Sequence, residues 1–243
     1  MDVHALFSVE GKVAVVTGGS RGIGYMIATG LLSSGAKVYI TSRKAEACDQ
    51  AAEELSEFGE CISLPADLAT TEGVDSFSRA FAEREEKLHI LCNNAGANWV
   101  APLGEMPESG FDKVIDINLK SPFFVTQSLL PQIKAAGSKE DPARIIMTGS
   151  INGIAVPTWV DNFSYSASKA GVMRVVESVA AEYEGSGLTA VALAPSTILF
   201  GDEDADATGV SVDEIASWCV RLCGPEGEAR NGQVIRAYGN QGA

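Results

Sequence analysis

TGGSRGIG, residues 17–24, stands between a β-branched run, KVAVVT (12–17), and a helical pattern with Ile23, Ile27 and Leu31 on one face. Glycines at such a junction permit positive φ and let the backbone approach a ligand closely. The N–H groups at the start of the helix can then bind a pyrophosphate. The G-x-x-x-G-x-G spacing in this strand–turn–helix context predicts a dinucleotide-binding turn, although a tight turn without a ligand would use the same glycines.

Apolar runs and helical patterns alternate along the rest of the chain. Most of the runs lack polar alternation, which is typical of parallel strands covered on both faces. We therefore predict an α/β fold: a doubly wound parallel sheet of about seven strands, flanked by helices on both faces in a three-layer α/β/α sandwich. The strands are expected at 12–17, 37–41, 61–64, 89–93, 144–149, 189–194 and 233–238, and the helices near 22–34, 45–57, 72–86, 110–136, 164–184 and 212–223.

Composition limits the classes of partner. The 243 residues carry a net charge of −14, and a field of this sign repels phosphate backbones and anionic lipid surfaces. Neither a nucleic acid nor a membrane is therefore an expected partner. The five cysteines are dispersed, as reduced thiols usually are, no apolar run approaches membrane-spanning length, and the N-terminus does not resemble a secretory leader. These features together favour the cytoplasm.

The end of the second expected strand indicates which dinucleotide is bound. An acidic residue there would bind the ribose hydroxyls of NAD, but the chain reads TSRK (41–44) instead. Arg43 and Lys44, with Arg21 from the glycine turn, would surround a phosphate-sized space, which favours NADP(H). The alternative is a set of solvated surface cations.

The stretch YSASK (165–169) holds a phenol and an amine one helical turn apart, with three small residues between them. A lysine ammonium at this distance is expected to favour the phenolate and to lower the pKa of Tyr165 from about 10 toward neutrality. Tyr165 would then donate the proton when a carbonyl is reduced. Ser150, at the end of the fifth strand, would donate a hydrogen bond to the oxygen on which charge develops.

Six motifs in this order resemble the short-chain dehydrogenase/reductase family: TGGSRGIG, ADL (66–68), NNAG (93–96), Asn118 in DINLKSPF, Ser150 in TGSING, and YSASK. The resemblance runs from about residue 10 to 198 and from 212 to 239. It implies a Rossmann fold, a nicotinamide cofactor and a catalytic tetrad of Asn118, Ser150, Tyr165 and Lys169. In this tetrad Asn118 would hold a water of a proton relay leading from the lysine. An asparagine on a helix face is the alternative for that position.

The expected site residues follow from the glycine turn, the basic cluster and the resemblance. The cofactor would contact Gly18, Ser20, Arg21, Gly22, Ile23, Gly24, Ser42, Arg43, Lys44, Asp67, Leu68, Asn94, Ala95, Gly96, Tyr165, Lys169, Pro195 and Ile198. The substrate side would include Asn98, Trp99, Ile151, Asn152 and Trp159, although the two tryptophans fit ordinary packing equally well. No metal ligand is expected.

LAPSTILF (193–200) departs from the family pattern. Ser196 stands where relatives carry a glycine after the proline, and a positive φ there would cost about 1 kcal/mol. Phe200 stands where a threonine usually grips the carboxamide of the coenzyme, and Thr197 would substitute only in a different register. The substrate lid, about residues 200–211, is short, which predicts an open cleft or closure by a partner.

The resulting hypothesis is an NADPH-dependent oxidoreductase of one Rossmann domain, residues 1–243, that reduces a ketone to a secondary alcohol. The sequence as a whole resembles 3-oxoacyl-(acyl-carrier-protein) reductases and their secondary-metabolism relatives, so the substrate would be a 3-oxoacyl thioester or a related secondary-metabolite carbonyl compound. The alternative is an NADP(H)-binding protein with little or no catalysis that serves as a sensor or an assembly partner. The short lid and the altered LAPSTILF segment favour this alternative. The resemblance also implies a homodimer or homotetramer through the helices near 110–136 and 164–184.

Overall fold

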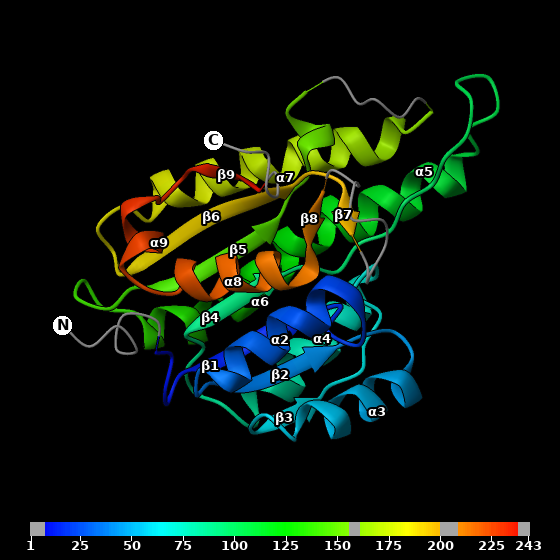
Figure 1. The fold of residues 1–243 in the computed structure, drawn as a ribbon. Helices are drawn as coiled ribbons and strands as arrows, with labels where there is room; N and C mark the ends of the chain where they lie inside the picture. The colour runs from blue at the N-terminus through cyan, green and yellow to red at the C-terminus, as the bar shows by residue number, and fades with distance from the viewer. Residues whose placement is uncertain (1–7, 156–160, 200–208, 238–243) are drawn as a thin grey trace.

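Seven parallel strands form one sheet in the order β3-β2-β1-β4-β5-β6-β9 (Figure 1). The computed structural model describes residues 8–155, 161–199 and 209–237. The strands are β1 (Val13–Thr17), β2 (Lys37–Thr41), β3 (Cys61–Ser63), β4 (Ile90–Asn93), β5 (Ala143–Thr148), β6 (Leu188–Pro195) and β9 (Val234–Ala237). β1 pairs in parallel with both β2 and β4, so the strand order reverses beside β1. The predicted doubly wound parallel sheet is confirmed.

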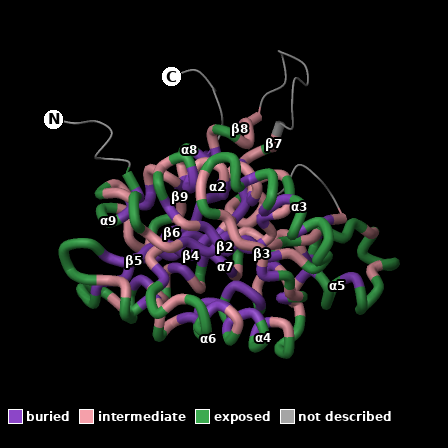
Figure 2. The backbone as a smooth tube through the Cα atoms, turned by 90° about the horizontal axis from the view of Figure 1, so that it is seen from below, coloured by how far each residue is buried: buried purple, intermediate pink, exposed green. Residues whose placement is uncertain are grey.

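Helices cover both faces of the sheet, which confirms the predicted three layers (Figure 2). Successive residues of a strand point to opposite faces. Ala14 and Val16 of β1 therefore pack in one core and Val15 in the other. The first core is closed by α2 (Gly22–Ser33), α3 (Ala45–Leu55) and α8 (Val212–Leu222), and the second by α4 (Thr71–Ala82), α6 (Ser121–Ala136) and α7 (Phe163–Glu182).

The helix expected at 110–136 is interrupted. It consists of α5 (Glu108–Ile115), a π-helical turn η1 (Asp116–Lys120) and α6. Pro122 lacks the N–H that an α-helix would direct to the carbonyl of Asn118, four residues earlier. The irregular turn therefore falls on a predicted site residue, as π-turns often do.

Three further short elements lie in the described part of the chain, and the sequence patterns did not predict them. Strands β7 (Ile198–Leu199) and β8 (Val210–Ser211) form a separate two-stranded parallel sheet next to α8. The short helix α9 (Pro225–Ala229) connects α8 to β9. Within the described ranges no helix is both long and apolar enough to cross a bilayer.

Candidate active site

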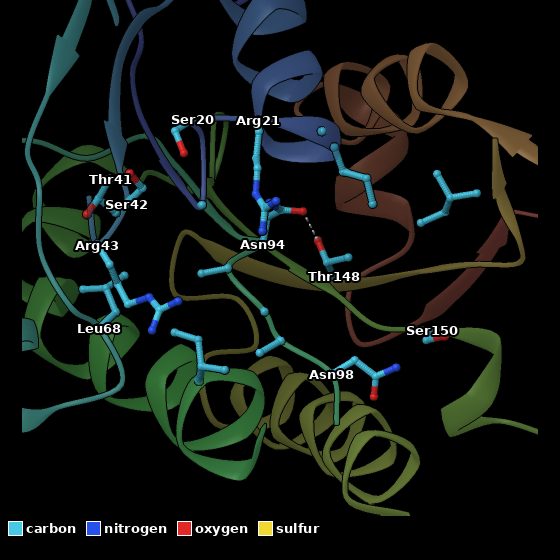
Figure 3. Close-up of a pocket in the computed structure, with 18 of the residues that line it drawn as sticks. Ser20, Arg21, Thr41, Ser42, Arg43, Leu68, Asn94, Asn98, Thr148 and Ser150 are labelled. Atoms are coloured by element: carbon cyan, nitrogen blue, oxygen red, sulfur yellow. Dashed lines mark hydrogen bonds between the residues drawn. The ribbon is translucent and has the colours of Figure 1, made fainter. Parts of the chain in front are cut away.

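A cavity of about 1030 Å³ opens at the carboxyl ends of the strands. Its walls come from the β1–α2 turn, the end of β2, the segments that follow β3, β4, β5 and β6, and one face of α7 (Figure 3). In open parallel sheets, ligands bind at this edge, where the strand order reverses. The cavity therefore lies where the topology of the sheet places a binding site.

The glycine turn forms the central wall of the cavity. Gly18 and Gly22 have φ of +69° and +56°, a region in which side chains are strained. A Cβ on Gly18 would lie 2.9 Å from Cα of Ala95, and one on Gly24 would lie 2.3 Å from the carbonyl oxygen of Gly18. The first turn of α2 has no side-chain cap, so its N–H groups remain available for a phosphate. The turn fits a dinucleotide pyrophosphate.

The three predicted cations lie together at the β1–β2 end of the cavity. Arg21, Arg43 and Lys44 are all exposed and line its wall, and the Arg43 side chain extends into the space (Figure 3). None of the three belongs to an ion pair among the described residues. Their charge is therefore free for an anionic ligand, as a 2′-phosphate would require.

Asn94 connects three strand ends behind this wall. The Thr17 hydroxyl accepts hydrogen bonds from the N–H groups of Asn94 (2.9 Å) and Ala95 (3.0 Å). The Asn94 amide oxygen accepts a hydrogen bond of 3.3 Å from Thr148 at the end of β5 (Figure 3). These bonds hold the ends of β1, β4 and β5 in register beneath the cavity.

Asn118 holds the loop that follows β4. Its side-chain oxygen accepts from Ala97 N–H at 2.8 Å, and its amide donates to Ala97 O at 3.0 Å and to Ser168 Oγ at 3.1 Å. The residue is 1% exposed, so it does not lie on a solvent-facing side of the helix. Both amide N–H groups of the side chain are used in these bonds, and Pro122 cannot donate to the Asn118 carbonyl as the fourth residue along would in an α-helix.

Ser150, Tyr165 and Lys169 line the opposite end of the cavity. Lys169 is 5% exposed, and its Nζ donates a 2.6 Å hydrogen bond to the Thr148 carbonyl. The same Nζ lies 5.7 Å from the centroid of the Tyr165 ring. Ser150 accepts a 3.2 Å hydrogen bond from Asn152 N–H at the start of the 3₁₀ helix η2 (Ile151–Gly153). The expected tyrosine–lysine pair thus forms on the first turns of α7.

The pKa values of Tyr165 and Lys169 differ from those expected from the sequence. Burial raises the pKa of Tyr165 above 10, and a hydrogen bond with Ser150 acts in the opposite direction. Burial also lowers the pKa of Lys169 to about 8. The prediction that Lys169 holds the pKa of Tyr165 low is therefore wrong for this arrangement, because desolvation has the largest effect on both groups. Tyr165 is a neutral phenol near pH 7, which is the form that can donate a proton.

Most of the other predicted cofactor residues line the cavity, but Gly24 and Asp67 do not. Gly24 is buried against Gly18. Asp67 is exposed between the lining residues Ala66 and Leu68, and its carboxylate accepts a hydrogen bond from Ala69 N–H.

The predicted substrate residues are divided. Asn98 lines the cavity, whereas Trp99, Ile151 and Asn152 are not among its lining residues. The Trp99 ring packs on Gly110, where a Cβ would lie 2.7 Å from the indole, and Lys113 Nζ lies 5.3 Å from the ring centroid. These contacts support the interpretation that Trp99 is a packing residue. Trp159 lies outside the described residues.

The segment after β6 reaches the cavity through Pro195, Ser196 and Ile198. Ser196 does not have positive φ, so the expected strain is absent. Thr197 is exposed and is not a lining residue, and Phe200 lies outside the described residues.

Several lining residues were not predicted. Most of them are neighbours of predicted ones, so each strand end could have been taken as a continuous segment. They are Thr41, Ala47, Ala66, Ala97, Ile117, Thr148, Gly149 and Ser196.

The chain has a glycine turn suited to a phosphate where the strand order reverses, and a tyrosine–lysine pair at the end of the same cavity. These two features place it in the class of Rossmann-type oxidoreductases. A family model described as short chain dehydrogenase matches residues 12–205. The chain belongs to this family.

Individual relatives show which members of the family the chain is similar to. The chain is 37% identical to the rhamnolipids biosynthesis 3-oxoacyl-[acyl-carrier-protein] reductase of Pseudomonas aeruginosa, over 96% of this chain and 97% of that protein. It is 31% identical to the 3-oxoacyl-[acyl-carrier-protein] reductase FabG of Vibrio cholerae, over 96% and 98%. The structure of the P. aeruginosa RhlG/NADP active-site complex superposes with a TM-score of 0.91 at 37% identity and covers 97% of this chain and 98% of that one.

Proposed function

We propose that this chain is an NADPH-dependent reductase that converts the ketone of a 3-oxoacyl thioester, or of a related small carbonyl compound, to a secondary alcohol. The observation that carries the proposal is one cavity with free cations at one end and a neutral phenol beside a buried lysine at the other. Its relatives carry reductase names, which does not favour the alternative of a nucleotide-binding protein with little catalysis.

The coenzyme would lie along the whole cavity. Arg21, Arg43 and Lys44 would bind the 2′-phosphate, and the glycine turn with the first N–H groups of α2 would bind the pyrophosphate. A bound nicotinamide supplies the hydride. The chain's own work is to hold the carbonyl carbon in front of that ring and to deliver a proton to its oxygen.

Proton delivery would fall to Tyr165. Ser150 donates a hydrogen bond to the carbonyl oxygen as negative charge develops there. Tyr165 then gives its proton to this oxygen, and the phenolate that forms lies close to the Lys169 ammonium, whose Nζ is 5.7 Å from the ring centroid. A water held by Asn118 would lead replacement protons toward Lys169.

Turnover tests the proposal directly. Purified protein mixed with NADPH and an acetoacetyl thioester should consume the absorbance of NADPH and yield the 3-hydroxyacyl product. Simple ketones and quinones in the same panel test how open the cleft is. If no carbonyl compound in the panel causes NADPH to be consumed, the proposed activity is wrong.

Reduction should slow as the pH rises through about 8, the pKa of Lys169. Below this pH the amine is an ammonium ion that stabilises the forming phenolate, and above it that charge is lost. Tyr165 does not cause this loss, because burial keeps its pKa above 10. The measurement is kcat/KM for ketone reduction against pH, with Lys169→Met as the variant whose residual rate should lack the inflection. A native profile that stays level to about pH 10, the ordinary lysine value, would contradict this role.

We also propose that the whole chain is one domain that works as a homodimer or homotetramer in the cytoplasm. Four phenylalanines on α5, α6 and α7 support self-association because they are 39–43% exposed: Phe111, Phe123, Phe124 and Phe163. All five cysteines are free, which fits a reducing compartment. Analytical ultracentrifugation of the native chain and of Phe123→Ser/Phe124→Ser tests the association.

A further inference from the structure

Ser196 lines the cavity, yet its hydroxyl has no partner within residues 8–155, 161–199 and 209–237. The residue follows Pro195 at the carboxyl end of β6. Its Oγ is buried and has no hydrogen-bond partner among the residues that the structure describes. A buried hydroxyl without a partner is unfavourable, because it has given up its hydrogen bonds to water. Since Ser196 borders the cavity, rotation of its side chain about χ1 would bring the hydroxyl to the cavity surface, where a bound molecule can supply the missing partner.

The backbone around Ser196 is held on both sides. Its own N–H donates a 2.9 Å hydrogen bond to the Ala237 carbonyl of β9, and the Thr197 carbonyl accepts a 2.8 Å hydrogen bond from Val210 N–H. The hydroxyl can therefore move mainly by rotation about χ1, between staggered positions. Within residues 195–198, all of which the structure describes, Thr197 carries the other hydroxyl, but it is exposed and outside the cavity wall.

The position of Ser196 in the cavity determines which part of the coenzyme this residue can contact. In the sheet, β6 lies beyond β5, whereas β2 lies on the other side of β1. Arg43 and Lys44 thus stand at one end of the cavity, the glycine turn in the middle, and Ser150, Tyr165 and Ser196 at the other end. If the phosphates occupy the first two places, the nicotinamide occupies the third.

The Ser196 hydroxyl and the nicotinamide carboxamide can form hydrogen bonds with each other. A nicotinamide carries a neutral carboxamide with one acceptor oxygen and two N–H donors, and a serine hydroxyl can both donate and accept. We propose that the Ser196 hydroxyl hydrogen-bonds this carboxamide and so fixes the orientation of the nicotinamide ring. This inference rests on the proposed NADP(H)-dependent function. It makes Ser196 a positioning residue, at the position where the family pattern has a glycine.

Two ligands separate this contact from a general effect on the fold. NADPH carries the nicotinamide, whereas 2′,5′-ADP keeps the adenosine and the 2′-phosphate without it. Ser196→Ala should raise the Kd for NADPH about fivefold, the usual size for one neutral hydrogen bond, and leave the Kd for 2′,5′-ADP unchanged. Ser196→Gly, which also lacks the hydroxyl, should behave in the same way. Thr197→Ala, the matched loss of a neighbouring hydroxyl, should change neither Kd.

Both constants can be measured by titration calorimetry on the purified full chain. An unchanged Kd for NADPH in Ser196→Ala overturns the inference, and so does an equal weakening of both ligands. The proposed function fails separately, when the native chain binds NADPH but reduces no carbonyl compound. In that case the Kd values of Ser196→Ala for NADPH and for 2′,5′-ADP still test the contact with the carboxamide.

Discussion

Replacing Tyr165 by phenylalanine should lower kcat for ketone reduction by about a thousandfold, while the Kd for NADPH stays within about twofold of the native value. The variant keeps the ring but loses the hydroxyl that donates the proton, and a positioned general acid usually contributes between about 10² and 10⁴ in rate. Coenzyme binding should persist because the cations and the glycine turn are untouched. Steady-state kinetics with an acetoacetyl thioester and a separate NADPH titration measure the two effects.

Tyr183→Phe is the matched control for this variant. Tyr183 lies just after the last residue of α7, and Lys134 Nζ stands 5.6 Å from its ring centroid, nearly the distance between Lys169 and Tyr165. Tyr183 does not line the cavity. Its variant should therefore keep full activity. If Tyr165→Phe retains more than about a tenth of the native kcat, Tyr165 is not the proton donor.

Removing two of the three cations should reverse the preference for the coenzyme. We expect Arg43→Ala/Lys44→Ala to raise the KM for NADPH about fiftyfold and to leave the KM for NADH nearly unchanged, because NADH has no 2′-phosphate. This rise in KM is smaller than the loss of two buried charged hydrogen bonds would cause. Both side chains are exposed, so water and salt screen their charge. Raising the ionic strength should therefore shrink the difference between the native chain and the variant.

The control for this prediction removes the same charge elsewhere. Lys87 and Lys139 are exposed and precede β4 and β5, at the opposite edge of the sheet. Lys87→Ala/Lys139→Ala should alter neither KM. An equal rise in the KM for NADPH in this control would show that overall charge attracts the coenzyme. A native chain that already prefers NADH would contradict the assignment of the basic cluster.

The strand ends of the site could be predicted because each depends on local sequence. The buried runs of β1, β4, β5 and β6 lack polar alternation, and the glycines of the turn carry the φ angles that their positions require. The four-residue spacing of Tyr165 and Lys169 likewise places both on one face of α7 without any knowledge of the rest of the molecule.

Features that depend on distant contacts could not be predicted in the same way. Asn118 is buried by its bonds to Ala97 and Ser168, which lie in other parts of the chain. The pKa of Tyr165 rises because the folded chain buries it, and spacing carries no information about burial. The two-residue strands β7 and β8 are too short to leave a sequence pattern.

The most direct test is a crystal structure of the native chain with NADP⁺ and a ketone substrate analogue bound together. We expect Tyr165 Oη and Ser150 Oγ both within about 3 Å of the analogue's carbonyl oxygen, with Lys169 Nζ against the ribose next to the nicotinamide. A complex in which the phenol turns away from that oxygen, or in which the nicotinamide lies at the Arg43 end of the cavity, would contradict the proposed chemistry.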